Sequence, residues 1–325
     1  MKRPREEGSQ GEEATASASA SARPDQAALP HPDPEALERE QEESLRRVEE
    51  GGIPLSAERR LGELRQGAGA FTSDLSVSGF ALCHKLGLKP LSQVMGSSIY
   101  QVGYQSANWP MMMGGSVVTE LNTLSDAWNE VRRLAFNRLA LEAKLAGAQA
   151  IVGVQVRTAA HDWAEGAIEY VVVGTAVSRA GQPAGAEPVI TDLSVADYSN
   201  LLQAGIEPAG IVAQTSVVFA AYQTFGLMEP GVINPVANYE VQEYTQAMYG
   251  AREVVMERLG MQARQLGANG IVGMRVSHSA RRQEVGSANR SRGGLVITFD
   301  ALGTAVRDQA TSIPTTPETT IDLSI

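Results

Sequence analysis

The chain of 325 residues has few of the side chains that structural metal sites and disulfide-rich proteins need, with one cysteine and four histidines. A lone cysteine, Cys83, excludes an internal disulfide and is typical of a reduced setting, so a cytoplasmic location is expected. No apolar run approaches the roughly 18–20 residues of a membrane helix, and the basic start is not followed by the apolar stretch of a secretory signal. We therefore expect no membrane insertion.

Positive charge is also scarce. The formal net charge is −10, and acidic residues outnumber basic ones both in the first 70 residues and in the remainder. Proteins that bind nucleic acids generally present a strongly basic face to the phosphates, so no nucleic-acid partner is expected. A hydrophobic fraction of 43% with 20% charged residues is typical of globular cores, and the length leaves room for two domains with tails.

Residues 1–70 form an acidic tail in which little ordered structure is expected. The first 32 residues are rich in Ser, Ala, Glu and Pro, and they hold too little apolar surface to offset the entropy of ordering, which predicts disorder. A helix is predicted next, with Asp33 as its N-cap, Pro34 at its first position and Gly51 after its end, and a second short helix after Ser56. The thin apolar stripe of the first helix favours a solvated helix, and the alternative is a docking site for a protein partner.

The strongest pattern in the sequence is internal repetition. Segments of residues 71–180 recur in the same order in residues 188–308, which indicates a duplicated domain. The matching segments are Asp74–Val77 with Asp192–Val195, Gly87–Pro90 with Gly205–Pro208, Tyr104-Gln105 with Tyr222-Gln223, Gly147–Gly153 with Gly267–Gly273, and Gly174–Val177 with Gly303–Val306. The chain therefore consists of the tail 1–70, two repeats and a C-terminal tail, 309–325.

The two copies together predict the elements of one repeat. Ser76 and Ser194 stand where helix N-caps belong, and a glycine follows the short helix in both copies. A strand comes next, then a long helix whose apolar residues recur at three- and four-residue steps, then two more strands. The predicted strands are Leu91–Tyr104, Ile151–Val156 and Ile168–Val177 in the first copy, and Ala209–Tyr222, Ile271–Val276 and Leu295–Val306 in the second. Because one amphipathic helix and a three-stranded sheet can bury each other's apolar face, the predicted fold is an α/β (α+β) two-layer sandwich, present twice.

At these segments the sequence resembles the YbjQ-like family, whose members are also called heavy-metal-binding domains. The resemblance rests on Gly147–Gly153 and Gly267–Gly273, each at the end of a long helix, and on the closing Gly-Thr-Ala-Val strands. It covers residues 71–178 and 189–307. It implies a dodecin-like sandwich and ring-shaped homo-oligomers, pentamers among them. A divalent or soft metal is a candidate ligand by the same resemblance, but no functional residue is carried over.

The candidate metal ligands are few and poorly spaced, since zinc and soft metals need clustered Cys and His. Cys83 and His84 are adjacent on a predicted helix, where neighbouring side chains point about 100° apart and cannot easily chelate one ion. His161 and His278 both fall just after a predicted strand. Two such loops that meet across an interface are the second candidate for a metal site.

Two further candidate surfaces occur in only one repeat. The run Met111, Met112 and Met113, next to Trp109, offers thioethers to copper(I), but such a run favours an apolar oligomer interface. A predicted hairpin loop in the second repeat is basic and is a candidate site for an anion or an acidic tail; its arginines are Arg281, Arg282, Arg290 and Arg292. The alternative for this loop is a solvated surface.

The C-terminal string Asp322-Leu323-Ser324-Ile325 is a third copy of Asp74–Val77 and Asp192–Val195. The first two copies precede helices, whereas no helix follows the third. A role that suits all three is a short extended segment added to the edge of a sheet, on its own domain or on a neighbour, so Asp322 and Leu323 are interface candidates. The alternative is a chance similarity of four residues.

No set of residues suited to catalysis recurs in both repeats, whether a Ser/His/Asp or Cys/His arrangement, a carboxylate pair or a phosphate-binding glycine loop. We therefore expect a non-enzymatic structural or interaction protein that forms homo-oligomers and needs no cofactor. Five chains would make two stacked rings, one of each repeat, and three chains would make one ring of six domains. The alternative function is a module that binds a small ligand or metal between domains or subunits.

Overall fold

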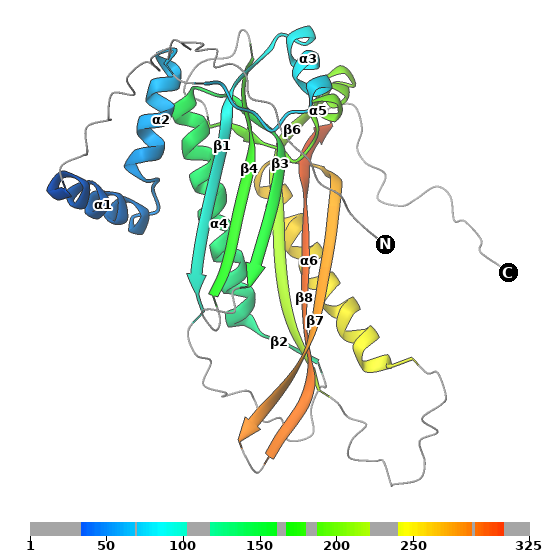
Figure 1. The fold of residues 1–325 in the computed structure, drawn as a ribbon. Helices are drawn as coiled ribbons and strands as arrows, with labels where there is room; N and C mark the ends of the chain where they lie inside the picture. The colour runs from blue at the N-terminus through cyan, green and yellow to red at the C-terminus, as the bar shows by residue number, and fades with distance from the viewer. Residues whose placement is uncertain are drawn as a thin grey trace, which may run out of the picture.

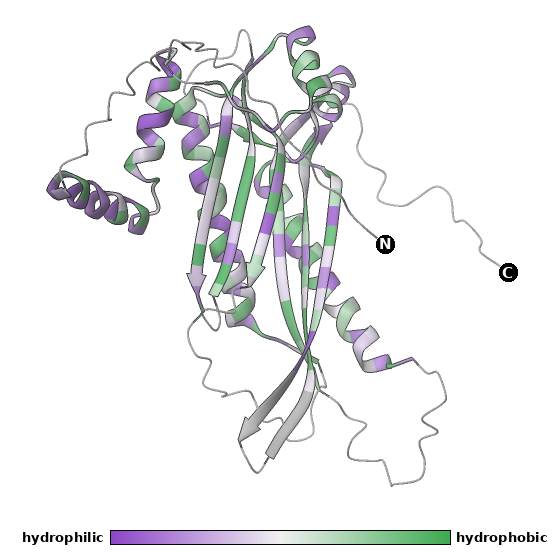
Figure 2. Ribbon diagram, viewed as in Figure 1, coloured by the Kyte–Doolittle hydropathy of each residue, from purple (hydrophilic) through white to green (hydrophobic). Residues whose placement is uncertain are grey.

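The computed structural model describes residues 34–68, 70–102, 118–160, 167–179, 187–221, 240–287 and 290–308. Two helices, α1 (Pro34–Glu49) and α2 (Leu55–Arg65), precede the repeats. α1 begins at Pro34, as the sequence predicts, whereas α2 begins ahead of its expected start after Ser56. Figure 2 shows α1 coloured hydrophilic along nearly its whole length, and none of its residues is buried.

The two repeats follow in the predicted order (Figure 1). The first contains α3 (Val77–Lys85), β1 (Leu88–Gln101), β2 (Val118–Glu120), α4 (Asn122–Ala146), β3 (Ala150–Ala160) and β4 (Ala167–Arg179). The second contains β5 (Val189–Ile190), α5 (Val195–Gln203), β6 (Ile206–Ala221), α6 (Gln242–Gln265), β7 (Gly270–Ser287) and β8 (Arg290–Asp308). The predicted mixed α/β class is confirmed. No helix in these ranges is long and apolar enough to cross a membrane.

The short helices α3 and α5 begin and end where the repeated segments place their caps. The hydroxyls of Ser76 and Ser194 each accept a hydrogen bond from the backbone N–H three residues later, at 3.1 and 3.2 Å. Gly87 and Gly205 follow the helices with φ of 66° and 77°, a left-handed conformation that glycine adopts without a Cβ clash. These caps bring the chain directly into β1 and β6.

The strands form two four-stranded sheets, in the orders β1-β4-β3-β5 and β2-β6-β8-β7. The three long strands of each sheet come from one repeat and are antiparallel. The fourth strand comes from the other side of the repeat boundary: β2 of the first repeat pairs with β6, and β5 pairs in parallel with β3. The prediction of three-stranded sheets is therefore wrong by one strand in each, because β2 and β5 are too short to form without a partner across this boundary.

Each long helix covers one face of its own sheet. α4 buries Val131, Ala135 and Leu139 against the first sheet, and α6 buries the equivalent residues against the second, Ala251, Val255 and Leu259. α4 approaches β1 most closely at Gly96, where a Cβ atom would lie 1.9 Å from a carbonyl oxygen of the helix. Only glycine fits at this position.

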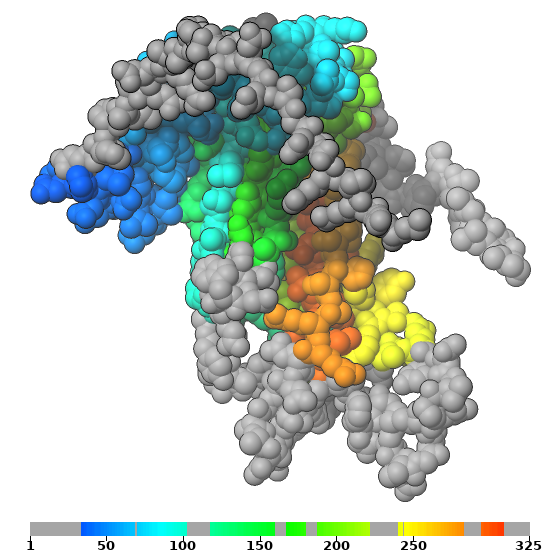
Figure 3. All heavy atoms as spheres, in the orientation of Figure 1, coloured from blue at the N-terminus to red at the C-terminus, as the bar shows by residue number. Residues whose placement is uncertain are grey.

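The second N-terminal helix is attached to the first repeat. Leu61 of α2 is buried, and the Arg60 guanidinium lies 3.0 Å from the carboxylate of the buried Glu142 on α4. Arg138 of α4 donates hydrogen bonds to the carbonyls of Val48 and Gly52 at the end of α1. In Figure 3 α1 and α2 form a lobe on one side of the molecule, beside the first sheet.

The β7–β8 hairpin is longer than predicted, and its end extends past the other strands (Figure 1). The prediction that Arg281, Arg282, Arg290 and Arg292 lie in a loop is wrong, because all four lie on the paired strands β7 and β8. Arg281, for example, stands opposite Val296. His278 also lies within β7, opposite Phe299, rather than after a strand. Backbone pairing does not require apolar side chains, so a polar hairpin with several glycines resembles a loop in sequence.

Candidate functional site at the joint between the repeats

The segment that leads from the first repeat into the second extends the edge of the first sheet. Thr191 N donates to Ile151 O at 2.9 Å, Gly153 N to Leu193 O at 2.8 Å, and Val154 N to Thr191 O at 3.2 Å. The two β3 donors, the N–H groups of Gly153 and Val154, lie in a β-bulge, where Gly153 has a φ of 64°. The bulge turns these groups outward, toward the added segment.

The side chains of the same segment bind the second repeat. The Asp192 carboxylate accepts a hydrogen bond from Thr304 Oγ1 at 2.7 Å, and its other oxygen lies 3.2 Å from Arg275 Nη2. The hydroxyls of Thr191 and Thr304 are 2.8 Å apart and buried. Arg275 also donates to the carbonyl of Val154 on the first repeat, at 3.2 Å. The Asp-Leu-Ser string therefore connects the repeats in addition to capping a helix.

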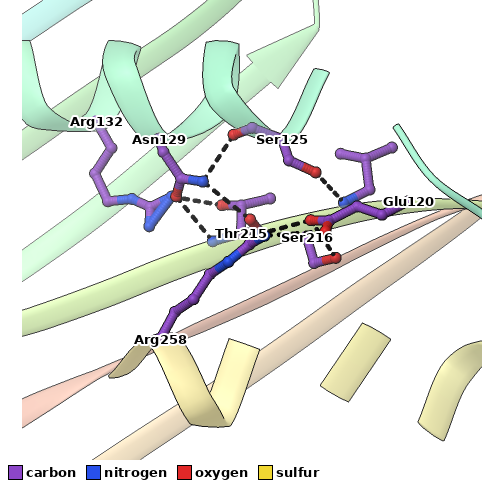
Figure 4. Close-up of polar contacts among 8 residues, drawn as sticks. Glu120, Ser125, Asn129, Arg132, Thr215, Ser216 and Arg258 are labelled. Carbon is purple, nitrogen blue, oxygen red and sulfur yellow. Dashed lines mark hydrogen bonds and ion pairs between the residues drawn. The ribbon is translucent and has the colours of Figure 1, made fainter. Parts of the chain in front are cut away.

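On the face of the second sheet opposite α6, the N-terminal half of α4 packs against β6 (Figure 4). Asn129 binds the strand as a neighbouring strand would, because Thr215 N donates to Asn129 Oδ1 and Asn129 Nδ2 donates to Thr215 O, both at 3.1 Å. Val217 N donates to Ser125 Oγ at 2.9 Å. β2 continues the pairing along β6. The first repeat thus satisfies the open edge of the second sheet.

A buried cation and a half-buried carboxyl group lie at the centre of this contact. Arg132 of α4 donates to Asn129 Oδ1 at 2.5 Å and to Thr215 Oγ1 at 2.6 Å, and its guanidinium carbon lies 5.9 Å from the centre of the Tyr170 ring. The Thr215 hydroxyl in turn donates to Asp300 Oδ1 at 2.5 Å. Arg132 and Asp300, from different repeats, are therefore connected through one hydroxyl group.

Burial is the main influence on the protonation of these groups. It raises the pKa of Asp300, against which the hydrogen bond from Thr215 and the charge of Arg132 both act. It also raises the pKa of Tyr170 to about 12 and lowers the pKa of Arg132. The arrangement places a cation and a carboxyl group from different repeats on either side of one hydroxyl group.

A second ion pair connects α6 to the first repeat. Arg258 Nη1 and Nη2 lie 2.7 and 2.9 Å from the two carboxylate oxygens of Glu120 on β2, and Ser216 Oγ donates to the same carboxylate at 3.0 Å (Figure 4). Burial raises the pKa of Glu120, but the hydrogen bonds from Arg258, Ser125 and Ser216 outweigh it and hold the pKa below its usual range. Glu120 is therefore held as a carboxylate.

The contact between the two repeats, which we call the joint, also leaves an open cleft of about 890 Å³. α4 contributes Arg132 and Phe136 to its wall, β6 contributes Ile211 and Gln214, and α6 contributes Gln262. Both polar and apolar groups line it, and its volume is in the range of sites that hold small organic molecules.

Comparison with known proteins agrees with this duplicated architecture. The model of the YbjQ family, described as putative heavy-metal-binding, matches residues 89–180 and 210–309. The chain belongs to the YbjQ family. It is 32% identical over 271 residues to the encapsulin nanocompartment protein Rv1762c of Mycobacterium tuberculosis, a match that covers 81% of this chain and 94% of that protein.

Other YbjQ-family relatives match about one repeat. The UPF0145 proteins TK1926 of Thermococcus kodakarensis and PYRAB04900 of Pyrococcus abyssi are 33% and 30% identical over 118 residues. These matches cover 36% of this chain and 88% and 87% of the two relatives. The archaeal relatives are therefore about one repeat long, whereas the mycobacterial protein is similar to the tandem.

The family description raises the question of a metal, and the described candidate residues do not fit one. Cys83 is completely buried among apolar side chains, and burial raises the pKa of its thiol, whereas metals bind the thiolate. His84 is exposed, with its ring 4.9 Å from that of Phe80, and His278 is exposed on β7. Across the described ranges no three His, Cys, Asp or Glu side chains come together as metal ligands.

Several other predicted positions lie outside the described residues, namely Trp109, Met111, Met112, Met113, His161, Asp322 and Leu323. Arg281 and Arg282 are exposed on β7, and Arg290 and Arg292 lie on β8. For these residues the sequence-based expectations stay predictions.

The residues of the joint were not predicted from the sequence. In sequence Arg132 resembles other helical arginines, because its partner Thr215 and the nearby Asp300 come from strands of the second repeat. The available signal was Asp300, a carboxylate between Phe299 and Ala301 in an otherwise apolar strand. A charged group in a buried strand requires a partner, since an unpaired buried charge is strongly destabilising.

Proposed function

We propose that this YbjQ-family chain is a non-enzymatic structural protein that assembles with copies of itself, much as its two repeats are joined to each other. Equivalent surfaces of the two repeats differ in how much of them is covered by other parts of the chain, and this difference supports the proposal. Val217, on the face of the second sheet that α4 covers, is 1% exposed, whereas its equivalent Ile99, on the uncovered face of the first sheet, is 59% exposed. Clustered apolar side chains left exposed in this way generally mark contacts with another protein.

The placement of the repeats favours one type of ring. α4 contacts both sheets, so the repeats stand side by side. Two stacked rings, one of each repeat, would need the repeats one above the other. A single ring in which the repeats alternate, such as three chains with six domains, agrees better with this arrangement.

Native mass spectrometry and light scattering of the full chain test the proposal. We expect one closed species with a fixed number of chains over a wide range of protein concentration. A monomer at micromolar concentration contradicts it.

The mycobacterial relative supports a finer proposal, that the chain associates with an encapsulin nanocompartment. The support is that this relative is an encapsulin nanocompartment protein and that the match covers 94% of its length. Co-expression with an encapsulin shell protein should make the chain elute with the shell in size-exclusion chromatography. A chain that elutes apart from intact shells contradicts this association without affecting self-assembly.

The cleft at the joint supports binding of a small ligand as a second candidate function. It predicts that a compound in fixed stoichiometry stays with the purified chain under native mass spectrometry and leaves on unfolding. A purified chain whose native mass equals that of the polypeptide alone contradicts this candidate.

A further inference from the structure

Each outer side of the two joined repeats presents one half of the joint described above. We call head the segment Phe71–Leu75 together with α3 and the uncovered face of the first sheet. We call tail the edge of β7 at Gly270–Met274 together with the outer face of α6. Inside the chain, the equivalent head of the second repeat is bound to the equivalent tail of the first.

The edge of β7 has the same shape as the edge of β3, which is already paired. Both strands shift register against their neighbour at the same place, between Val152 and Gln155 in β3 and between Val272 and Arg275 in β7. Gly153 and Gly273 have the same φ in these bulges, 64°. β7 is the outermost strand of its sheet, and the described part of the chain offers no backbone acceptor at this edge for the N–H groups of Gly273 and Met274.

The segment Phe71–Leu75 shares a side-chain turn with its equivalent in the joint, and Thr72 O accepts a hydrogen bond from Gln93 N of its own sheet at 2.7 Å. Leu75 N donates to Ser73 Oγ at 3.3 Å, as the equivalent residues do in the second repeat. Asp74 N donates to Thr175 Oγ1 at 3.1 Å, which attaches the segment to its own sheet. The groups equivalent to those that bind β3 are Ser73 N, Ser73 O and Leu75 O, and no backbone partner binds them within the described ranges.

The head and the tail are therefore complementary in hydrogen bonding. The head presents one N–H donor, from Ser73, followed along the chain by two acceptors, the carbonyls of Ser73 and Leu75. The tail presents two donors, from Gly273 and Met274, and one acceptor, Ile271 O. The joint inside the chain makes these three bonds with the equivalent groups.

Apolar side chains follow the same pattern. Val195, at the start of α5, is 2% exposed inside the joint, whereas its equivalent Val77, at the start of α3, is 89% exposed. On the tail, Met274 is exposed and its equivalent Val154 is buried. α6 presents Tyr249, which is 64% exposed and equivalent to the sheet-binding Asn129 of α4. An exposed tyrosine here suits a surface such as the uncovered face of the first sheet, where Met95 and Ile99 are exposed.

We propose that the edge of β7 takes the segment Phe71–Leu75 of a second copy as an added parallel strand, with α6 against the uncovered face of that copy's first sheet. This inference rests on the proposed function and names the surfaces that the assembly uses. The other candidate occupant is the C-terminal string around Asp322. The segment Phe71–Leu75 is favoured because α3, directly attached to it, brings an exposed apolar surface to the same contact. Head-to-tail contacts of this kind close into a ring when the rotation per chain divides a full turn.

Proline substitutions in the full chain test the two surfaces separately. Ser73→Pro removes the N–H donor of the head, and Met274→Pro removes one donor of the tail; both groups face an open edge, where proline is tolerated. The matched controls are Ser73→Ala, which loses the hydroxyl but keeps the N–H, and Met274→Ala. We expect both proline variants to be folded monomers by circular dichroism and light scattering, while both alanine variants stay assembled.

Mixing the two proline variants provides a sharper result. Ser73→Pro keeps an intact tail and Met274→Pro keeps an intact head, so only one contact can form between them. The mixture should therefore give a heterodimer with one copy of each and nothing larger. A symmetric interface, in which both copies use the same surface, cannot give this outcome.

A cysteine pair decides the question if a proline variant fails to fold. Ile151 stands opposite Ile190 inside the chain, so Ile271 should stand opposite Thr72 of the next copy. Neighbouring strands lie about 4.8 Å apart, within the range of a disulfide. Thr72→Cys and Ile271→Cys, each combined with Cys83→Ala, should form a covalent dimer when mixed and oxidised, and neither should do so alone.

The outcomes separate this inference from the proposed function. An assembled wild type together with assembled proline variants and no cross-link overturns the surfaces while self-assembly stands. Loss of assembly on deletion of residues 318–325, with Ser73→Pro still assembled, identifies the C-terminal string as the occupant instead. A monomeric wild type overturns the proposed function itself.

Discussion

Replacing Arg132 with methionine is the most direct test of how the two repeats are held together. Methionine fills a similar volume without charge, so the substitution removes the cation and leaves little empty space. Arg132 is 5% exposed and donates to Asn129 and Thr215. Without it, the half-buried Asp300 keeps the hydrogen bond from Thr215 but loses the nearby positive charge.

The expected cost follows from these contacts. Each hydrogen bond from a charged donor contributes about 1.5–3 kcal/mol, and Arg132 donates to two neutral acceptors. We therefore expect Arg132→Met to lower the free energy of unfolding by about 3–5 kcal/mol at neutral pH. Replacing both groups, as Arg132→Met with Asp300→Asn, should cost less than the sum of the two single changes, because the carboxyl group that loses the nearby positive charge is then also absent.

The pH dependence provides an independent check. Burial raises the pKa of Asp300 in the folded chain, so the native state binds this proton more tightly than the unfolded state does. Stability from this group is therefore present at acid pH and is lost as pH rises through the raised pKa. Removing Arg132 takes away a charge that lowers this pKa, so the loss grows. The destabilisation by Arg132→Met should be larger at pH 7.5 than at pH 4.5.

Urea unfolding followed by far-ultraviolet circular dichroism measures these quantities, at one fixed protein concentration because assembly also stabilises the folded chain. The matched control is Arg133→Met, since Arg133 pairs with Glu130 on the exposed face of α4. The control should cost less than about 1 kcal/mol. A cost of Arg132→Met as small as that of the control, or one that is the same with and without Asp300→Asn, would refute the electrostatic coupling of Arg132 to Asp300.

Three further predictions concern the repeats themselves. Gly96→Ala should destabilise the chain by more than about 3 kcal/mol in thermal unfolding, because the added Cβ would lie 1.9 Å from a helix carbonyl oxygen. As the control, Gln214→Ala at the equivalent position should have a mild effect, because Gln214 lines the open cleft. Ser194→Ala should cost about 1 kcal/mol in urea unfolding, because the hydroxyl accepts the Asp197 N–H, and Ser194→Thr should recover most of the loss. Cys83 should not react with a thiol reagent at pH 8 until urea unfolds the chain, because it is fully buried and burial raises the pKa of its thiol; rapid reaction of the native chain would contradict the described packing.

The sequence predicted those parts of the fold that are determined locally or appear twice. Ser76 and Ser194 identified the short helices because a cap acts on the backbone three residues away. The periodic apolar residues of the long helices identified their buried faces. β5 could not be predicted in the same way, because two residues become a strand only when Ile151 and its neighbours supply the other edge. The length of the β7–β8 hairpin was missed for a related reason, since its pairing depends on backbone groups that the side chains do not reveal.

The candidate site was less predictable than the fold. The joint has neither chemistry that is present in both repeats nor clustered Cys and His, which are the patterns that mark a site in a sequence. Its central residues differ between the repeats, since Asp300 corresponds to Val171 and Asn129 corresponds to Tyr249. A contact between two repeats is asymmetric by nature, because one repeat supplies the helix and the other supplies the sheet. Differences between the copies, rather than similarities, were the relevant signal.

These differences suit the two kinds of joint that the proposed alternating ring requires. The joint inside the chain is covalently linked and needs little further association energy, so it can hold a buried arginine and a carboxyl group, which fix the register while adding little net stability. The joint between chains must overcome the loss of translational and rotational freedom on association. At the equivalent positions it has apolar groups, Val171 in place of Asp300 and Tyr249 in place of Asn129, and apolar burial supplies most of the favourable free energy in protein association. On this argument Tyr249→Ala should weaken assembly more than Arg132→Met does, and Arg132→Met should weaken folding more than Tyr249→Ala does.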